Sequence, residues 1–184
     1  MFLAMPTKPQ DILFDLAQRH DGYFTVAEAK AEGLSITALL GYLNRGSLER
    51  PSRGVYRLAR YPEMSPNSYL WASVLWPQAH VDVRAALSHY TALRLHGLSD
   101  TNPSLTHLTV PKTFRIRRDH PKQLRLYRAD LLDFDVEFVD GLPVTTIERT
   151  LRDVAKTGDE RTLADALRDA RQRDLPIPRE LQRV

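Results

Sequence analysis

Residues 36–45 combine an apolar stripe with a face of small and polar residues, a pattern suited to a helix that contacts nucleic acid. The stripe follows the i, i+3, i+4, i+7 spacing of a helix that buries one side, and its members are Ile36, Leu39, Leu40 and Leu43. With these residues in the core, the outward face consists of Thr37, Ala38, Gly41, Tyr42, Asn44 and Arg45. Short side chains let such a helix approach the major groove closely, where Thr, Tyr or Asn can reach base edges or phosphates.

Two arginines lie at or beside the turn of a hairpin that we expect after this helix. Arg50 precedes the turn and Arg53 lies within it, where the wing of a DNA-binding domain meets phosphates or the minor groove. A second interpretation stays open at this point. Winged helices also serve as docking modules for proteins, and the same residues would then be ordinary solvated groups.

A strongly basic block follows in the second half of the chain. The formal net charge is +3, but residues 111–128 alone contribute +6 and residues 129–184 contribute −4. Arg115 and Arg117 alternate with apolar residues, so their charges could share one face of a strand. The candidate phosphate-binding residues of the block are Lys112, Arg115, Arg117, Arg118 and Lys122. They could instead form a charged sheet edge that resists aggregation, or pair with the acidic segment 129–184.

The histidines do not form a pattern that predicts a metal site. His89 and His96 are seven residues apart, too far for one ion to join them directly on a helix. Ser88 precedes His89 immediately, and adjacency in sequence does not orient a nucleophile and its base. We interpret Ser88 as a helix cap and His89 as a packed or hydrogen-bonded imidazole.

The remaining reactive groups also lack a catalytic arrangement. Asp133, Asp135 and Glu137 share one strand parity, which indicates a solvated face. The chain has no cysteine, which excludes disulfides, thiolate metal sites and thiol catalysis. It also lacks a glycine-rich phosphate-binding loop. We therefore expect no catalytic residue, no metal and no cofactor, and we expect that the protein is not an enzyme.

The elements that must position the outward-facing helix follow a recognisable order. Residues 8–20, about 26–32 and 36–45 predict three helices, and residues 48–58 predict a hairpin. A capping box at Thr25 and Glu28 starts the second helix, and Ser35 caps the third. Three helices and a hairpin within 60 residues form a winged helix-turn-helix. We predict this domain over residues 1–60.

Residues 61–184 predict a second domain that mixes helices and strands. A turn-rich linker at 60–66 leads into it. Apolar spacing predicts helices at 67–76, 85–96, 147–157 and 159–173, and strands at 106–110, 123–127 and 136–139. The expected fold class is α+β, with an N-terminal winged helix-turn-helix followed by a mixed α/β domain that contains an antiparallel-type sheet.

Composition supports a globular chain. The chain has 184 residues, of which 27% are charged and 42% hydrophobic, so it can bury a core. Collagen-like, coiled-coil and disordered classes do not fit. The apolar start is too short for a secretory signal, and no stretch approaches the ~20 apolar residues of a membrane span. We expect a cytoplasmic protein with no membrane partner.

Several ordered motifs resemble those of the AbiEi-type antitoxins. The first domain contributes residues 22–29, 48–50 and 53–58. The second contributes residues 86–93, 95–98, 109–111 and 144–155, so the likeness covers about residues 10–158.

The resemblance implies an antitoxin of a type IV toxin–antitoxin system. In that family the winged helix binds inverted repeats in promoter DNA and represses its own operon. The second domain counteracts a nucleotidyltransferase toxin, often without a stable complex. Carried onto this sequence, the resemblance places Arg53 in the wing and the recognition-helix contacts at Ser35, Thr37, Ala38, Tyr42 and Arg45. The basic residues of 112–122 are candidates from charge alone.

The sequence leaves alternatives open for both the oligomeric state and the function. The protein could be a monomer in solution or a dimer on DNA, because two monomers can bind an inverted repeat as well as a dimer can. The chain could also be a stand-alone winged-helix transcriptional regulator, or a protein-interaction module with no direct DNA contact.

Overall fold

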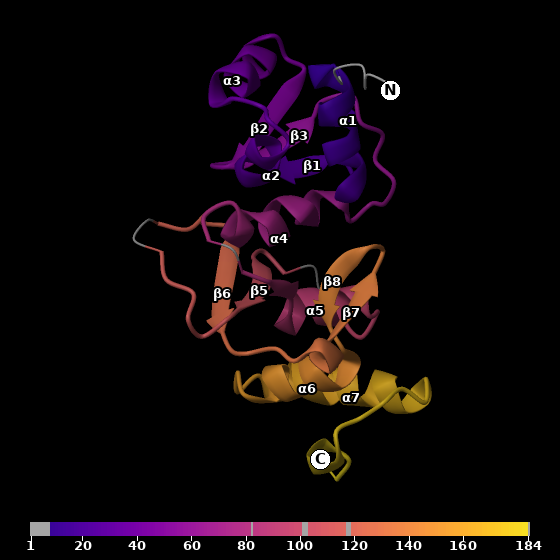
Figure 1. Ribbon diagram of the computed structural model, residues 1–184. Helices are drawn as coiled ribbons and strands as arrows, with labels where there is room; N and C mark the ends of the chain where they lie inside the picture. Colours follow the sequence, from indigo (N-terminus) through magenta and orange to yellow (C-terminus); the bar gives the residue numbers. More distant parts are fainter. Residues whose placement is uncertain (1–7, 82, 101–102, 117–118, 184) are drawn as a thin grey trace, which may run out of the picture. The chain divides into compact units, whose positions relative to one another are not determined.

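The computed structural model describes residues 8–81, 83–100, 103–116 and 119–183. The chain divides into two compact units, Met1–Asp82 and Val83–Val184. Figure 1 shows the helices and strands of both.

The first unit is a winged helix-turn-helix with one additional helix. Its elements are α1 (Pro9–Arg19), β1 (Tyr23–Thr25), α2 (Val26–Ala31), α3 (Ile36–Asn44), β2 (Leu48–Ser52), β3 (Val55–Leu58), a 3-10 turn (Ser68–Leu70) and α4 (Trp71–Gln78). The strands form an antiparallel sheet in the order β1-β3-β2. The three predicted helices and the hairpin are confirmed. Residues 23–25, which lie between the first two predicted helices, form the third strand because they pair with β3.

The two predicted helix starts have the expected hydrogen bonds. The Thr25 hydroxyl accepts from the Glu28 backbone N–H at 3.1 Å, and the Glu28 carboxylate accepts from the Thr25 N–H at 2.7 Å. The Ser35 hydroxyl accepts from the Ala38 N–H at 3.1 Å. Each bond satisfies a donor that a helix end leaves unpaired, so the boundaries of α2 and α3 are set locally.

The core of the first unit lies between the helices and the sheet. Phe24 of β1 and Tyr56 of β3 stack with ring centroids 5.9 Å apart. The buried cluster that includes them consists of Leu13, Leu16, Phe24, Ala29, Leu34, Leu39, Leu48 and Tyr56. Every helix from α1 to α3 contributes to it, so the position of α3 is fixed by the same core that holds the hairpin.

Helix α4 belongs to the first unit, although we expected the domain boundary at residue 60. It packs against all three strands of the small sheet. The Trp71 ring lies 4.6 Å from the His20 ring. Asp21 accepts hydrogen bonds from the Ser68 hydroxyl and from the Met64 N–H. The turn-rich stretch at 60–66 therefore leads back onto the sheet, and the boundary differs from the expected one for that reason.

The second unit carries a mixed five-stranded sheet. Its elements are β4 (Ala86–Leu87), α5 (His89–Leu95), β5 (Thr106–Val110), β6 (Leu124–Arg128), a 3-10 turn (Asp133–Asp135), β7 (Val136–Val139), β8 (Leu142–Thr145), α6 (Ile147–Ala155), α7 (Glu160–Gln172) and a final 3-10 turn (Arg179–Leu181). The strand order is β6-β5-β4-β8-β7. The β4–β5 and β7–β8 pairs are antiparallel, whereas β4–β8 and β5–β6 are parallel. The α+β class with antiparallel pairing is confirmed.

One predicted helix begins too early in the sequence. Residues 85–88 were expected to form its first turn, but Ala86 and Leu87 form β4 in the middle of the sheet. Both are buried, and a short apolar run does not distinguish a central strand from a buried helix turn.

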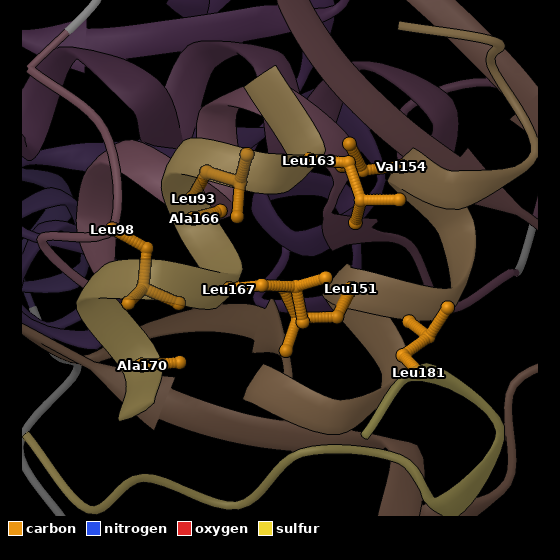
Figure 2. Packing of buried hydrophobic residues seen from close by; sticks show 9 residues of the cluster. All are labelled: Leu93, Leu98, Leu151, Val154, Leu163, Ala166, Leu167, Ala170 and Leu181. Carbon is orange, nitrogen blue, oxygen red and sulfur yellow. The ribbon is translucent and has the colours of Figure 1, made fainter. Parts of the chain in front are cut away.

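Helices α5, α6 and α7 supply most of the side chains of one core cluster of the second unit. Figure 2 shows its nine side chains: Leu93, Leu98, Leu151, Val154, Leu163, Ala166, Leu167, Ala170 and Leu181. Helix α7 supplies four of them, Leu163, Ala166, Leu167 and Ala170. Small Ala166 and Ala170 allow α7 to pack closely beside its neighbours.

Candidate nucleic-acid interface

Helix α3 is rotated about its axis relative to the sequence prediction. Leu39 is fully buried, and Tyr42 and Leu43 pack partly against the same cluster. Ile36 and Leu40, which we expected in the core, are 46% and 42% exposed. The prediction was wrong for these two because an apolar stripe wider than the contact with the core leaves its outer members in solvent.

The exposed face of α3 retains most of the expected polar residues. Ser35, Thr37, Asn44 and Arg45 are exposed, and Ala38 is half-buried. Residues 35–44 include no acidic side chain, so none on this helix opposes an approaching phosphate.

Two of the predicted groove contacts on α3 touch the protein itself. Tyr42 lies partly against the core cluster. The Arg45 guanidinium carbon lies 4.7 Å from the centroid of the Tyr42 ring. A Cβ on Gly41 would meet an Arg45 guanidinium nitrogen at 3.3 Å. Arg45 therefore folds back across the last turn of α3 and stacks on an aromatic ring, an arrangement that favours its positive charge.

The hairpin presents Arg50 on the edge strand β2 and Arg53 in the turn between β2 and β3. Arg50 and Arg53 are exposed, and the Arg50 guanidinium carbon is 6.0 Å from the Tyr56 ring centroid. Pairing between β2 and β3 shifts register between Glu49 and Ser52. Such an irregularity accommodates Pro51, which cannot donate a ladder hydrogen bond.

The turn of the hairpin is held by its neighbours in the first unit. Gly54 has φ +82°, and a Cβ at this position would lie 2.9 Å from Cβ of Ala79, just beyond α4. The Gly54 carbonyl accepts from the Val26 N–H at 2.8 Å. The wing is thus fixed at its tip as well as along its strands.

The basic block adopts a different conformation from the strand that we predicted. Between the parallel strands β5 and β6, residues 111–116 and 119–123 form no helix or strand, and the Phe114 side chain is buried. Arg115 donates to the carbonyls of Lys112 at 2.6 Å and of Phe114 at 2.9 Å. The prediction of alternating faces was wrong because Arg115 bonds to these nearby carbonyls instead of projecting from a strand. Arg117 and Arg118 lie outside the described residues.

The other basic side chains of this region differ in their surroundings. The Lys112 ammonium nitrogen lies 3.6 Å from an Asp130 carboxylate oxygen, as the alternative of pairing with the acidic segment expects. Lys122 and Arg125 are exposed. Arg128 donates to the Phe114 carbonyl at 3.4 Å. The basic residues therefore do not act as one free strip.

A buried polar cluster surrounds the start of α5. The Ser88 hydroxyl accepts from Thr109 at 2.8 Å and lies 3.0 Å from Nδ1 of His89, and it makes no capping bond. The His89 ring stacks on Tyr127 at 3.5 Å, and the Tyr127 hydroxyl is 3.0 Å from Nδ1 of His107. Burial lowers the pKa of His89 to about 3 and that of His107 to about 4.

This cluster stabilises the join between β4, β5 and α5. Ser88 is completely buried, so its hydroxyl cannot meet a nucleic acid or protein substrate. The hydrogen-bonded imidazole at His89 is confirmed. The predicted cap at Ser88 was wrong because its side chain bonds to Thr109 and His89 instead.

An ion network overturns the prediction of a solvated carboxylate face. Asp135 is only 7% exposed, and its carboxylate accepts from Arg149 at 2.9 Å. Arg149 also donates to Asp153 at 2.9 Å. Asp133 and Glu137 are exposed as expected. The spacing of Arg149 and Asp153, four residues apart on α6, was the sequence signal for part of this network.

Two further observations concern a metal site and a membrane span, neither of which the sequence predicted. Within the described ranges, no three or more His, Cys, Asp or Glu side chains are grouped to hold a metal ion. The described helices also include none that is both long and apolar enough to cross a membrane.

The chain joins a winged helix-turn-helix to a mixed α/β unit, the architecture of a two-domain protein. Residues 11–59 match the family model described as a transcriptional regulator, AbiEi antitoxin. Residues 84–175, half of the chain, match the AbiEi antitoxin C-terminal domain. The chain belongs to the AbiEi antitoxin family. No curated protein matches it. Helix α4 lies between the two matched segments.

Proposed function

We propose that this chain is a DNA-binding antitoxin that represses its own operon and counteracts a nucleotidyltransferase toxin. The observation that carries the proposal is the pairing of a regulator domain and an antitoxin C-terminal domain in one chain. We assign promoter binding to the first unit and toxin neutralisation to the second.

The exposed side of the first unit supports the DNA-binding half of the proposal. Ser35 and Thr37 lie exposed on α3 or at its cap and supply short hydrogen-bonding groups for the major groove. Arg50 and Arg53 supply exposed positive charges on the hairpin. Ala38, Tyr42 and Arg45 remain candidate contacts, although Tyr42 and Arg45 must leave their mutual contact to reach DNA fully.

The second unit adds candidate phosphate contacts. Lys122 is exposed, and we propose it as the first candidate among the basic residues there. Arg125 is exposed too, but its guanidinium carbon lies 6.0 Å from the Tyr127 ring centroid. Lys112 and Arg115 are weaker candidates because each already interacts within the chain. Substituting Lys122 with alanine should make the salt dependence of binding shallower by about 0.9 on a log–log plot if Lys122 contacts a phosphate.

The DNA-binding half is tested by titrating the full chain against the DNA upstream of its own reading frame. Fluorescence anisotropy at several salt concentrations gives the affinity and its salt slope. Arg53→Ala should weaken binding to this duplex and to a shuffled duplex by the same factor, because a phosphate contact carries no sequence information. Arg168→Ala is the control, since Arg168 is an exposed arginine of α7 paired with Asp165. A salt-independent isotherm contradicts the electrostatic contribution.

The antitoxin half is tested by separating the two activities in one chain. The genes that flank the reading frame are screened for a toxic nucleotidyltransferase, which is then expressed with the full chain or with its Thr37→Ala, Arg53→Ala double variant. The variant should lose repression of a promoter reporter but still protect cells from the toxin. Loss of protection together with repression, with the variant folded, would contradict the division of labour between the units.

A further inference from the structure

The outward face of α3 carries two large aliphatic side chains that the fold does not use. Ile36 and Leu40 are 46% and 42% exposed and lie one helical turn apart. The core contact of α3 is supplied by Leu39, with Tyr42 and Leu43 partly buried beside it. Exposed aliphatic groups gain little free energy on folding, so these two side chains are available for contact with a partner.

The surroundings of this pair match the chemistry of a base-pair edge in the major groove. Thr37 and Asn44 are exposed near the pair and can donate and accept hydrogen bonds. Gly41 follows Leu40 directly, and the Arg45 guanidinium covers it. The one arginine of this helix end, Arg45, stacks on Tyr42. The centre of the face therefore offers apolar and amide groups rather than the cation that usually recognises guanine.

We propose that Ile36 and Leu40 are specificity-determining residues that contact the 5-methyl groups of thymines. This inference rests on the proposed DNA binding. Thymine is the base that presents an apolar group in the major groove, and its adenine partner presents the acceptor and donor pair that asparagine recognises. Leu40 and Asn44 are four residues apart and so lie on one face of α3. Together they select A·T base pairs.

Charge supports DNA as the occupant of this face. Residues 35–44 contain no carboxylate, and the hairpin that follows adds the exposed Arg50 and Arg53. The hairpin also exposes Glu49, whose carboxylate lies 3.5 Å from the Arg57 guanidinium, so the positive charge offered to a phosphate backbone comes from Arg50 and Arg53.

The test replaces thymine by uracil, which lacks only the methyl group. The DNA upstream of the reading frame is footprinted with the full chain, and a duplex of the protected site is made with single thymines changed to uracil. We expect about fourfold weaker binding for each methyl group that Ile36 or Leu40 contacts. The protein is unchanged in this experiment, so folding of a variant does not affect the outcome.

Variants then assign each methyl group to a side chain. Ile36→Ala and Leu40→Ala should each bind the thymine duplex about fourfold more weakly and lose the response to one set of uracil substitutions. Phe14→Ala is the matched control, because Phe14 is 48% exposed but belongs to α1. It should keep both the affinity and the full response to uracil.

The outcomes separate this inference from the function on which it rests. Selective binding to the upstream DNA with no response to uracil at any thymine overturns the inference and leaves DNA binding intact. Equal binding to upstream and shuffled duplexes overturns sequence-specific repression itself. If sedimentation velocity shows that the chain self-associates and that Ile36→Ala, Leu40→Ala abolishes this without changing DNA affinity, the face binds a second copy and the inference is wrong.

Discussion

Gly54→Ala should destabilise the first unit more than an ordinary glycine substitution in a turn. Gly54 has φ +82°, and an added Cβ would lie 2.9 Å from Cβ of Ala79. Gly33 is the matched control, because it has φ +85° but no atom within 4 Å of an added Cβ. Both variants place an alanine in a left-handed backbone conformation, but only Gly54→Ala brings a Cβ close to Ala79.

The expected magnitudes follow from these two contributions. A left-handed alanine costs about 1–2 kcal/mol, and the reduced freedom of the unfolded chain offsets part of this. Gly33→Ala should therefore cost about 1 kcal/mol. The clash at Gly54 adds the cost of overpacking, about 1–3 kcal/mol. Gly54→Ala should lower the free energy of unfolding by about 2–4 kcal/mol.

Tryptophan fluorescence is the appropriate assay. The chain has two tryptophans, Trp71 and Trp76, both buried on α4. Their emission during a urea titration therefore reports the helix that Gly54 approaches. Ala79→Gly removes the clashing methyl group, so Gly54→Ala in that background should cost about as much as Gly33→Ala does in the original chain.

Two results would refute the reasoning. If Gly54→Ala is no more destabilising than Gly33→Ala, the hairpin does not contact the end of α4. If Ala79→Gly does not rescue Gly54→Ala, the excess cost has another origin. In either case α4 would no longer explain why residues 61–82 belong to the first unit.

The remaining predictions concern the second unit. Arg149→Met leaves the buried Asp135 and Asp153 without their shared partner and should cost about 3–5 kcal/mol in thermal unfolding followed by circular dichroism, whereas Arg168→Ala, at an exposed pair, should cost less than about 1 kcal/mol. Burial lowers the pKa of His89 to about 3 and of His107 to about 4, so both are neutral when folded. Above the unfolded pKa of about 6.5, the histidines are neutral in both states and do not lower stability. As pH falls from there toward the folded pKa values, the free energy of unfolding drops by about 1.4 kcal/mol per histidine for each pH unit, because only the unfolded chain binds the protons. His107→Gln should make acid unfolding shallower over this range, and an unchanged pH dependence would show that His107 is not buried as a neutral group.

Local signals in the sequence predicted most of the first unit. The capping box at Thr25 and the cap at Ser35 depend on residues three positions apart, and such interactions can be recognised without the fold. The rotation of α3 could not be predicted in this way. Its stripe of four aliphatic residues is wider than the core requires, and only packing decides that Leu39 is buried while Ile36 and Leu40 face solvent.

The wrong predictions in the second unit share one physical cause, because each depends on a contact with a residue far away in the sequence. Asp135 follows an alternating pattern that indicates solvent, but Arg149, fourteen positions along the chain, buries it. Residues 86–87 resemble a helix turn until β5 and β8 pair with them on both sides. The partners of Ser88 likewise include Thr109 on the next strand. The elements that carry the candidate residues, α3 and the hairpin, could be predicted because local order alone defines a winged helix, and contact of those residues with DNA stays a prediction.

The strand order of the larger sheet has a consequence for synthesis of the chain. Strand β4 lies at the centre, yet its neighbour β8 ends at Thr145, and Leu87 pairs with Val144. During translation the first unit is complete once α4 has emerged, whereas β4 keeps an open edge until β8 follows. We expect a ribosome-bound chain to be ready for DNA before its antitoxin domain can fold, and a product truncated before β8 to expose an unpaired central strand.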